Sequence, residues 1–309
     1  MHNTDRGGIS MRIREPGKIA EGLYLFGLEE SCIYLLEGRN ESIIINGGLN
    51  YTVPALLDQF KKFDIDEEKI TKMLILHAHF DHVGIIPFFK RRKPSIEVFA
   101  SERGWEILSM PKAIKTINQF SREVAAHLGR SGLYDDNNVD WGHDIHGLTV
   151  SEGDRIDLDD KEVMIYETPG HSSCSISAYV PSLKALFPSD GGGVPFRNTS
   201  VIAGNSNFTQ YQNSLEKLMS LDADFVCGDH YGCVSGEEAK HFVENTSQIA
   251  WEYRHAIERA YMKTKDIDAA AKKLNEDFSN EIPGYMIPAH IYEGVIRQMV
   301  RHIAACLEE

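Results

Sequence analysis

Six consecutive positions of this chain, 77–82 (HAHFDH), hold three histidines and an aspartate directly behind an apolar run. Residues i and i+2 share a face of an extended chain, so we expect His77 and His79 to reach one cation. Asp81 and His82 then point toward a second cation. Imidazole and carboxylate ligands together favour zinc, iron or manganese over calcium or magnesium. The spacing therefore predicts half of a two-metal site.

Three further candidate ligands follow apolar runs elsewhere in the chain. They are His171 in ETPGHSS, Asp190 in ALFPSDGGG and His230 in VCGDHYG. The glycines after Asp190 allow the backbone to approach closely. A lone histidine at a strand end is more often structural, but five of the 13 histidines share this pattern. The repeated pattern favours a metal centre over separate structural histidines.

Hydrophobic periodicity indicates which elements position these side chains. Short runs rich in β-branched, aromatic and aliphatic residues predict strands at 22–27, 32–37, 42–46, 72–76, 96–100, 161–167, 174–180, 184–190 and 224–230. Helical spacing predicts helices at 53–63, 101–130 and 207–221, and three more after residue 236. The chain is therefore expected to be an α/β protein of two strand-rich halves with helices.

Composition excludes several classes of function. The 309 residues carry a net charge of −14, from 46 acidic and 32 basic side chains, which argues against a nucleic-acid partner. No apolar run approaches the roughly 18 residues of a membrane span. Five scattered cysteines without a C-x-x-C pair favour a reduced compartment. With no apolar signal segment at the N-terminus, we expect a cytoplasmic protein.

The metal-ligand pattern resembles that of the metallo-β-lactamase superfamily over about residues 20–235, from H-x-H-x-D-H through the TPGHS histidine to the last histidine. The resemblance implies an αββα sandwich that binds two divalent metal ions, zinc or else iron or manganese. Asp190 stands where β-lactamases usually have a cysteine ligand, and Asn46 where many hydrolytic members have aspartate. The implied ligands are His77, His79 and His171 for one ion, Asp81, His82 and His230 for the other, and Asp190 as the bridge.

The expected domain organisation follows from the same resemblance. Residues 1–19 would form an N-terminal leader and residues 20–236 the catalytic domain, with a helical insertion at about 101–130. Residues 237–309 would form a helical extension that covers the active site. In that extension, Tyr285 and His290 flank the break PGYMIPAH. They would either overhang the metals or pack as an ordinary turn between helices.

The expected activity is hydrolysis of a thioester or ester of a small acyl group. Two divalent ions would lower the pKa of a bridging water from 15.7 toward about 7, and the resulting hydroxide would attack the carbonyl. Asp81 would be the catalytic residue that accepts the proton and relays it to the leaving group. Two segments, SERGWEILSM and IPAHIYEGVIRQMVRHI, resemble the quinolone-signal-response (2-aminobenzoylacetyl-CoA) thioesterases. The resemblance favours an acyl-CoA-type thioesterase.

Other interpretations stay open at this point. HFDHVG also resembles the N-acyl-homoserine lactonases, and a helical tail is typical of glyoxalase II, a hydroxyacylglutathione hydrolase. A metal-binding regulatory protein that acts through its helical surface is an alternative of another class. A phosphodiesterase is disfavoured by the acidic charge. We expect a small-molecule substrate, no nucleic-acid or membrane partner, and either a monomer or a homodimer.

Overall fold

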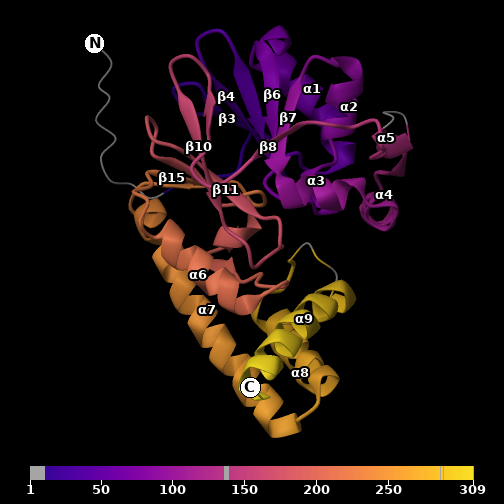
Figure 1. Ribbon diagram of the computed structural model, residues 1–309, viewed down its shortest axis with the longest axis vertical. Helices are drawn as coiled ribbons and strands as arrows, with labels where there is room; N and C mark the ends of the chain where they lie inside the picture. Colours follow the sequence, from indigo (N-terminus) through magenta and orange to yellow (C-terminus); the bar gives the residue numbers. More distant parts are fainter. Residues whose placement is uncertain (1–10, 136–138, 286, 288, 309) are drawn as a thin grey trace.

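The computed structural model of the protein describes residues 11–135, 139–285, 287 and 289–308, and it contains two seven-stranded sheets flanked by helices (Figure 1). Three buried apolar layers hold it together. The central layer lies between the sheets and includes Tyr34, Leu74, Val163 and Phe187. The outer two layers join each sheet to its helices. The expected αββα sandwich is confirmed.

The first sheet holds the N-terminal strands. Its order is β2 (Gly17–Ala20), β3 (Leu23–Leu28), β4 (Ser31–Glu37), β5 (Ser42–Ile45), β6 (Ile70–Leu74), β7 (Glu97–Ser101) and β8 (Leu148–Val150). Strands β2 to β5 pair antiparallel, and β5 to β8 pair parallel. The helices on this side are α1 (Val53–Lys62), α2 (Ile86–Arg92), α3 (Glu102–Ser109), α4 (Pro111–His127) and α5 (Ser131–Asp135).

The second sheet contains strands from the N-terminal part of the chain and from residues 155–235. Its order is β1 (Met11–Ile13), β16 (Cys233–Ser235), β15 (Phe225–Cys227), β12 (Ala185–Phe187), β11 (Ile176–Val180), β10 (Glu162–Glu167) and β9 (Arg155–Asp157). A separate hairpin consists of β13 (Val194–Phe196) and β14 (Thr199–Val201). Helices α6 (Phe208–Leu218) and α7 (Glu237–Thr264) follow in the chain, then α8 (Ile267–Glu281) and α9 (Ala289–Glu308).

The C-terminal helices extend away from the second sheet. Figure 1 shows the long helix α7 running from that sheet, with α8 and α9 folded back along it. The segment between α8 and α9 returns toward the sandwich, because Tyr285 contacts Tyr231 beside the last candidate ligand, with ring centroids 6.1 Å apart. Within the described residues, no helix combines the length and the apolar composition needed to cross a membrane.

Two expectations about the chain were wrong. Residues 11–13 and 17–20 are strands of the two sheets rather than part of a leader, and residues 1–10 lie outside the described residues. These strands are too short and too polar for hydrophobic periodicity to reveal them. They form because they pair with β16 and β3 of the two sheets. The single helix expected over 101–130 is two helices. Pro111 starts α4 because it lacks the N–H that a continuous helix would need.

Candidate metal centre

The seven predicted ligands converge at one end of the sandwich, between the two sheets. Four come from the segment after β6, where residues 80–82 form a 3-10 turn. The other three follow strands of the second sheet, in the β10–β11 turn, after β12 and in the β15–β16 loop. His79 is half-buried, and the six buried side chains are those of His77, Asp81, His82, His171, Asp190 and His230.

Three histidines, His77, His79 and His171, form what we call the first donor group. The Nε2 atom of His171 lies 3.2 Å from Nε2 of His77 and 3.0 Å from Nδ1 of His79. Burial lowers the pKa of His77, and it lowers the pKa of His79 to about 3. Three neutral nitrogens that face one point are a suitable donor set for zinc, iron or manganese.

Asp81, His82 and His230 form the second donor group. Oδ2 of Asp81 lies 3.6 Å from Nε2 of His82 and 3.7 Å from Nε2 of His230. Burial alone would raise the pKa of Asp81, but the charges of the two imidazoles outweigh it, and the pKa falls below its ordinary value. A carboxylate that stays ionised between two imidazoles can contribute to a second cation site.

Asp190 reaches both donor groups. Its Oδ2 lies 3.6 Å from Nε2 of His171 and 3.4 Å from Nε2 of His82. Its Oδ1 lies 3.6 Å from Nε2 of His230. The carboxylate of Asp190 therefore lies between the two donor groups.

The donor set fits divalent metal ions on a further ground. His82 Nε2 and Asp190 Oδ1 are buried, and neither has a hydrogen-bond partner among the described residues. Leaving such atoms unsatisfied costs free energy, which a cation between them would remove. The fold and these donor groups therefore indicate divalent metal ions at this site.

Backbone carbonyls orient two of the imidazoles. His171 donates from Nδ1 to the carbonyl oxygen of Ala203 (2.8 Å), and His230 donates from Nδ1 to that of Glu30 (2.7 Å). Because Nδ1 carries the proton in each ring, the lone pair of Nε2 faces the cluster.

Two polar residues behind the cluster were not anticipated from the sequence. Ser189 and Asp229 each precede a predicted ligand, and both are buried. Oγ of Ser189 lies 2.9 Å from Nδ1 of His77, and Oδ2 of Asp229 lies 3.0 Å from Nδ1 of His82. Their only signal in the sequence is adjacency to Asp190 and His230, which does not reveal where their side chains point.

Asn46, the departure noted in the sequence, lies beside the same imidazole. Its Oδ1 is 3.2 Å from Nδ1 of His82, while its Nδ2 donates to the carbonyl oxygen of Cys32 (2.7 Å). Nδ1 of His82 is thus shared between a neutral amide oxygen and the carboxylate of Asp229. A negative charge still supports this ring, although it comes from residue 229 and not from residue 46.

Aromatic rings cover one side of the cluster. Tyr285, between α8 and α9, packs against Phe196 and Tyr231, with centroids 5.5 Å and 6.1 Å away. Burial and then the negative charge of Asp190 raise the pKa of the Tyr285 hydroxyl. This tyrosine therefore lies beside Tyr231, which follows the candidate ligand His230, whereas His290 is exposed on α9.

The helical insertion packs against the ligand segment. Phe80, within the ligand segment, packs edge-on against Phe120 of α4, with centroids 5.7 Å apart. Arg130, just beyond α4, lies over the ring of Tyr51 at 5.2 Å. The insertion thus contacts the segment that carries the first four candidate ligands.

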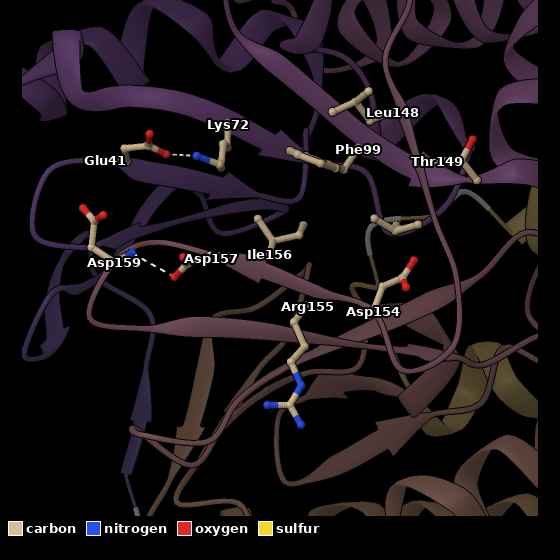
Figure 2. Close-up of a pocket in the computed structure, with 11 residues that line it drawn as sticks. Glu41, Lys72, Phe99, Leu148, Thr149, Asp154, Arg155, Ile156, Asp157 and Asp159 are labelled. Carbon is tan, nitrogen blue, oxygen red and sulfur yellow. Dashed lines mark hydrogen bonds and ion pairs between the residues drawn. The ribbon is translucent and has the colours of Figure 1, made fainter.

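A cavity of about 570 Å³ lies elsewhere, along strands β6 to β9 (Figure 2). It is larger than many ligand sites, but its lining includes none of the seven candidate ligands. Figure 2 shows Glu41 paired with Lys72 at one end, and Asp157 accepting from the backbone N–H of Asp159 (3.0 Å). These charged groups stabilise local structure, so the cavity is not the candidate active site.

Comparison with known proteins agrees with this geometry. A family model described as the metallo-beta-lactamase superfamily matches residues 27–230. The metallo-beta-lactamase fold-containing protein ST1585 of Sulfurisphaera tokodaii is 22% identical over 215 residues, 67% of this chain and 75% of that protein. The hydroxyacylglutathione hydrolase of Aliivibrio fischeri is 25% identical over 210 residues, 65% of this chain and 62% of that protein. The structure of a metallo-beta-lactamase family protein from Thermus thermophilus has a similar fold, with TM-score 0.66, 15% identity and coverage of 94% and 95% of the two chains.

Proposed function

Because the chain belongs to the metallo-β-lactamase superfamily, we propose that it is a metal-dependent hydrolase that cleaves the thioester or ester of a small acyl group, most readily an acyl-CoA-type thioester. The observation that carries the proposal is the position of Asp190 between two donor groups. That arrangement suits two divalent ions, for which zinc, iron and manganese are the candidates.

The ions would supply a hydroxide nucleophile at neutral pH and polarise the carbonyl of the substrate. The protein's own groups would control the proton. Asp81, ionised and with Oδ2 3.7 Å from Nε2 of His230, is placed to accept the proton of the attacking water and to deliver it to the leaving group. A thiolate leaves more readily than an alkoxide, so hydrolysis of a thioester depends least on protonation of the leaving group by Asp81.

The walls around the centre support a small acyl group. Tyr285 packs with Tyr231 and Phe196, and Phe80 packs with Phe120. Both clusters adjoin candidate ligands in the sequence and would offer apolar surface to the substrate. Apolar walls with a few polar groups are typical of small-molecule sites. The relatives named hydroxyacylglutathione hydrolase support the thioester class, and they make an acylglutathione the second candidate substrate.

The test is thiol release from a panel of acyl-CoA and acylglutathione thioesters by protein loaded separately with zinc, manganese or iron. We expect release from CoA esters, and its loss in Asp190→Asn. Release from acylglutathione alone would favour the second candidate. Absence of release across the panel, with bound metal confirmed, would contradict a thioesterase, and lactones and phosphodiesters would then be tested.

A further inference from the structure

Two side chains behind the ligands connect the two donor groups through hydrogen bonds. Ser189 donates from Oγ to Oδ2 of Asp229 (2.6 Å), so its oxygen accepts from Nδ1 of His77 (2.9 Å). The same Oδ2 of Asp229 lies 3.0 Å from Nδ1 of His82. A continuous path thus runs from an imidazole of the first donor group to an imidazole of the second, through one carboxylate oxygen.

Water cannot replace this path. Ser189 is 1% exposed and Asp229 is 2% exposed. A buried imidazole N–H that loses its acceptor is destabilised, because it is removed from water and makes no hydrogen bond in exchange. The acceptors at Nδ1, Ser189 for His77 and Asp229 together with Asn46 for His82, therefore favour a proton on Nδ1 of both rings.

The backbone at Ser189 adopts an unfavourable conformation. Its φ is +52°, in a region where L residues other than glycine are rarely found. The turn there would suit glycine, yet the chain has a serine whose Oγ lies between His77 and Asp229. Strain at a residue with this contact points to a role in the site.

We propose that Ser189 and Asp229 are positioning residues that fix the tautomer and orientation of His77 and His82, so that one buried carboxylate supports both metal subsites. The inference rests on the proposed metal-dependent function. An alternative interpretation is that Asp229 is itself a metal ligand, because its carboxylate lies close to ring nitrogens of His77 and His82. That interpretation would use the Nδ1 side of His82, away from Asp81 and Asp190, and it would have to displace the Ser189 hydroxyl from Asp229.

The test uses the full-length protein, stripped of metal and titrated with zinc alone by calorimetry. Outer hydrogen bonds of this kind typically contribute about 10- to 100-fold to metal affinity. Ser189→Ala should weaken one of the two binding steps by that factor, because only His77 loses its acceptor. Asp229→Asn should weaken both steps, because the serine and His82 lose the same carboxylate.

A second readout separates positioning from general packing. In nitrogen-15 NMR spectra of the zinc-loaded protein, Ser189→Ala should shift the Nδ1–H of His77, and Asp229→Asn should shift those of His77 and His82. The matched control is Ser177→Ala, which removes a buried hydroxyl that donates to the carbonyl oxygen of Pro188 (3.1 Å). It should lower thermal stability and leave both zinc affinities unchanged.

The proposal is overturned if Ser189→Ala and Asp229→Asn bind two zinc ions with wild-type affinities. It is also overturned if Ser177→Ala lowers the zinc affinity as much as those two variants do. These outcomes differ from failure of the proposed function. Wild-type protein that binds two ions with the expected variant pattern, yet hydrolyses no thioester, would contradict the substrate class and leave the positioning role intact.

Discussion

His77 and His171 approach each other from different sheets, and their Nε2 atoms lie 3.2 Å apart although 94 positions separate them in the chain. His77 follows β6 of the first sheet, and His171 lies between β10 and β11 of the second. Each ring donates from Nδ1 to a buried oxygen, so both Nε2 lone pairs face the same space. A cation in that space would join the two sheets.

Removal of metal should therefore destabilise the whole sandwich. An ion that binds only the folded state adds about 4 kcal/mol when its free concentration is about 1,000 times Kd. We expect a strong chelator to lower the Tm by several degrees in differential scanning calorimetry. The same chelator should have a much smaller effect on His171→Ala. An unchanged Tm after verified metal removal would contradict a structural contribution of the ions.

The two subsites should respond differently to pH. Burial lowers the pKa of His79 to about 3 and also lowers the pKa values of its partners in the first donor group, so these rings lose their protons at a lower pH than an ordinary histidine does. Burial alone would lower the pKa of His82, but the charges of Asp81 and Asp190 outweigh it and raise the pKa. In the metal-free protein His82 therefore keeps its proton to a higher pH than an ordinary histidine does, and it must release that proton when an ion binds.

The expected outcome is that the affinity of one binding step depends less on pH than that of the other, which weakens as the pH falls. Calorimetry in buffers of different ionisation enthalpy counts the protons released at each step. Two steps with equal proton release would show that the donor groups do not differ in this way.

Asp81→Asn should affect turnover more than substrate binding. The amide keeps the size of the side chain but cannot accept the proton of the attacking water, a function typically worth about 100- to 10,000-fold. We expect kcat to fall within that range and KM to change little, measured at saturating metal. The metal content of the variant must be measured as well. If the variant has lost one ion, the fall in kcat comes from weaker metal binding and not from the lost proton acceptor.

Tyr285→Ala should change the preference for the acyl group. The ring packs beside Tyr231, which follows the candidate ligand His230, and loss of apolar contact in a pocket is typically worth about 10-fold or more in kcat/KM. His290→Ala is the matched control, since that side chain is exposed on α9. Equal acyl preference in wild type and Tyr285→Ala would place the substrate away from this wall.

The seven side chains singled out in the sequence lie together in the structure, and each of them comes after an apolar run that contains a strand. The sequence did not reveal Ser189 and Asp229. Their roles depend on the parallel pairing of β12 with β15, which places the ends of these strands side by side. The strand at residues 11–13 was missed for the same reason, since its pairing with β16 joins positions more than 200 apart.

The most direct test of the central claim is thioester hydrolysis by metal-free protein as zinc, manganese or iron is added in measured equivalents. If Asp190 joins two metal sites, activity should rise with added metal and reach its plateau at about two ions per chain. Asp190→Asn should then show no such rise. Equal activity in metal-free protein, or a plateau that Asp190→Asn reproduces, would contradict the account.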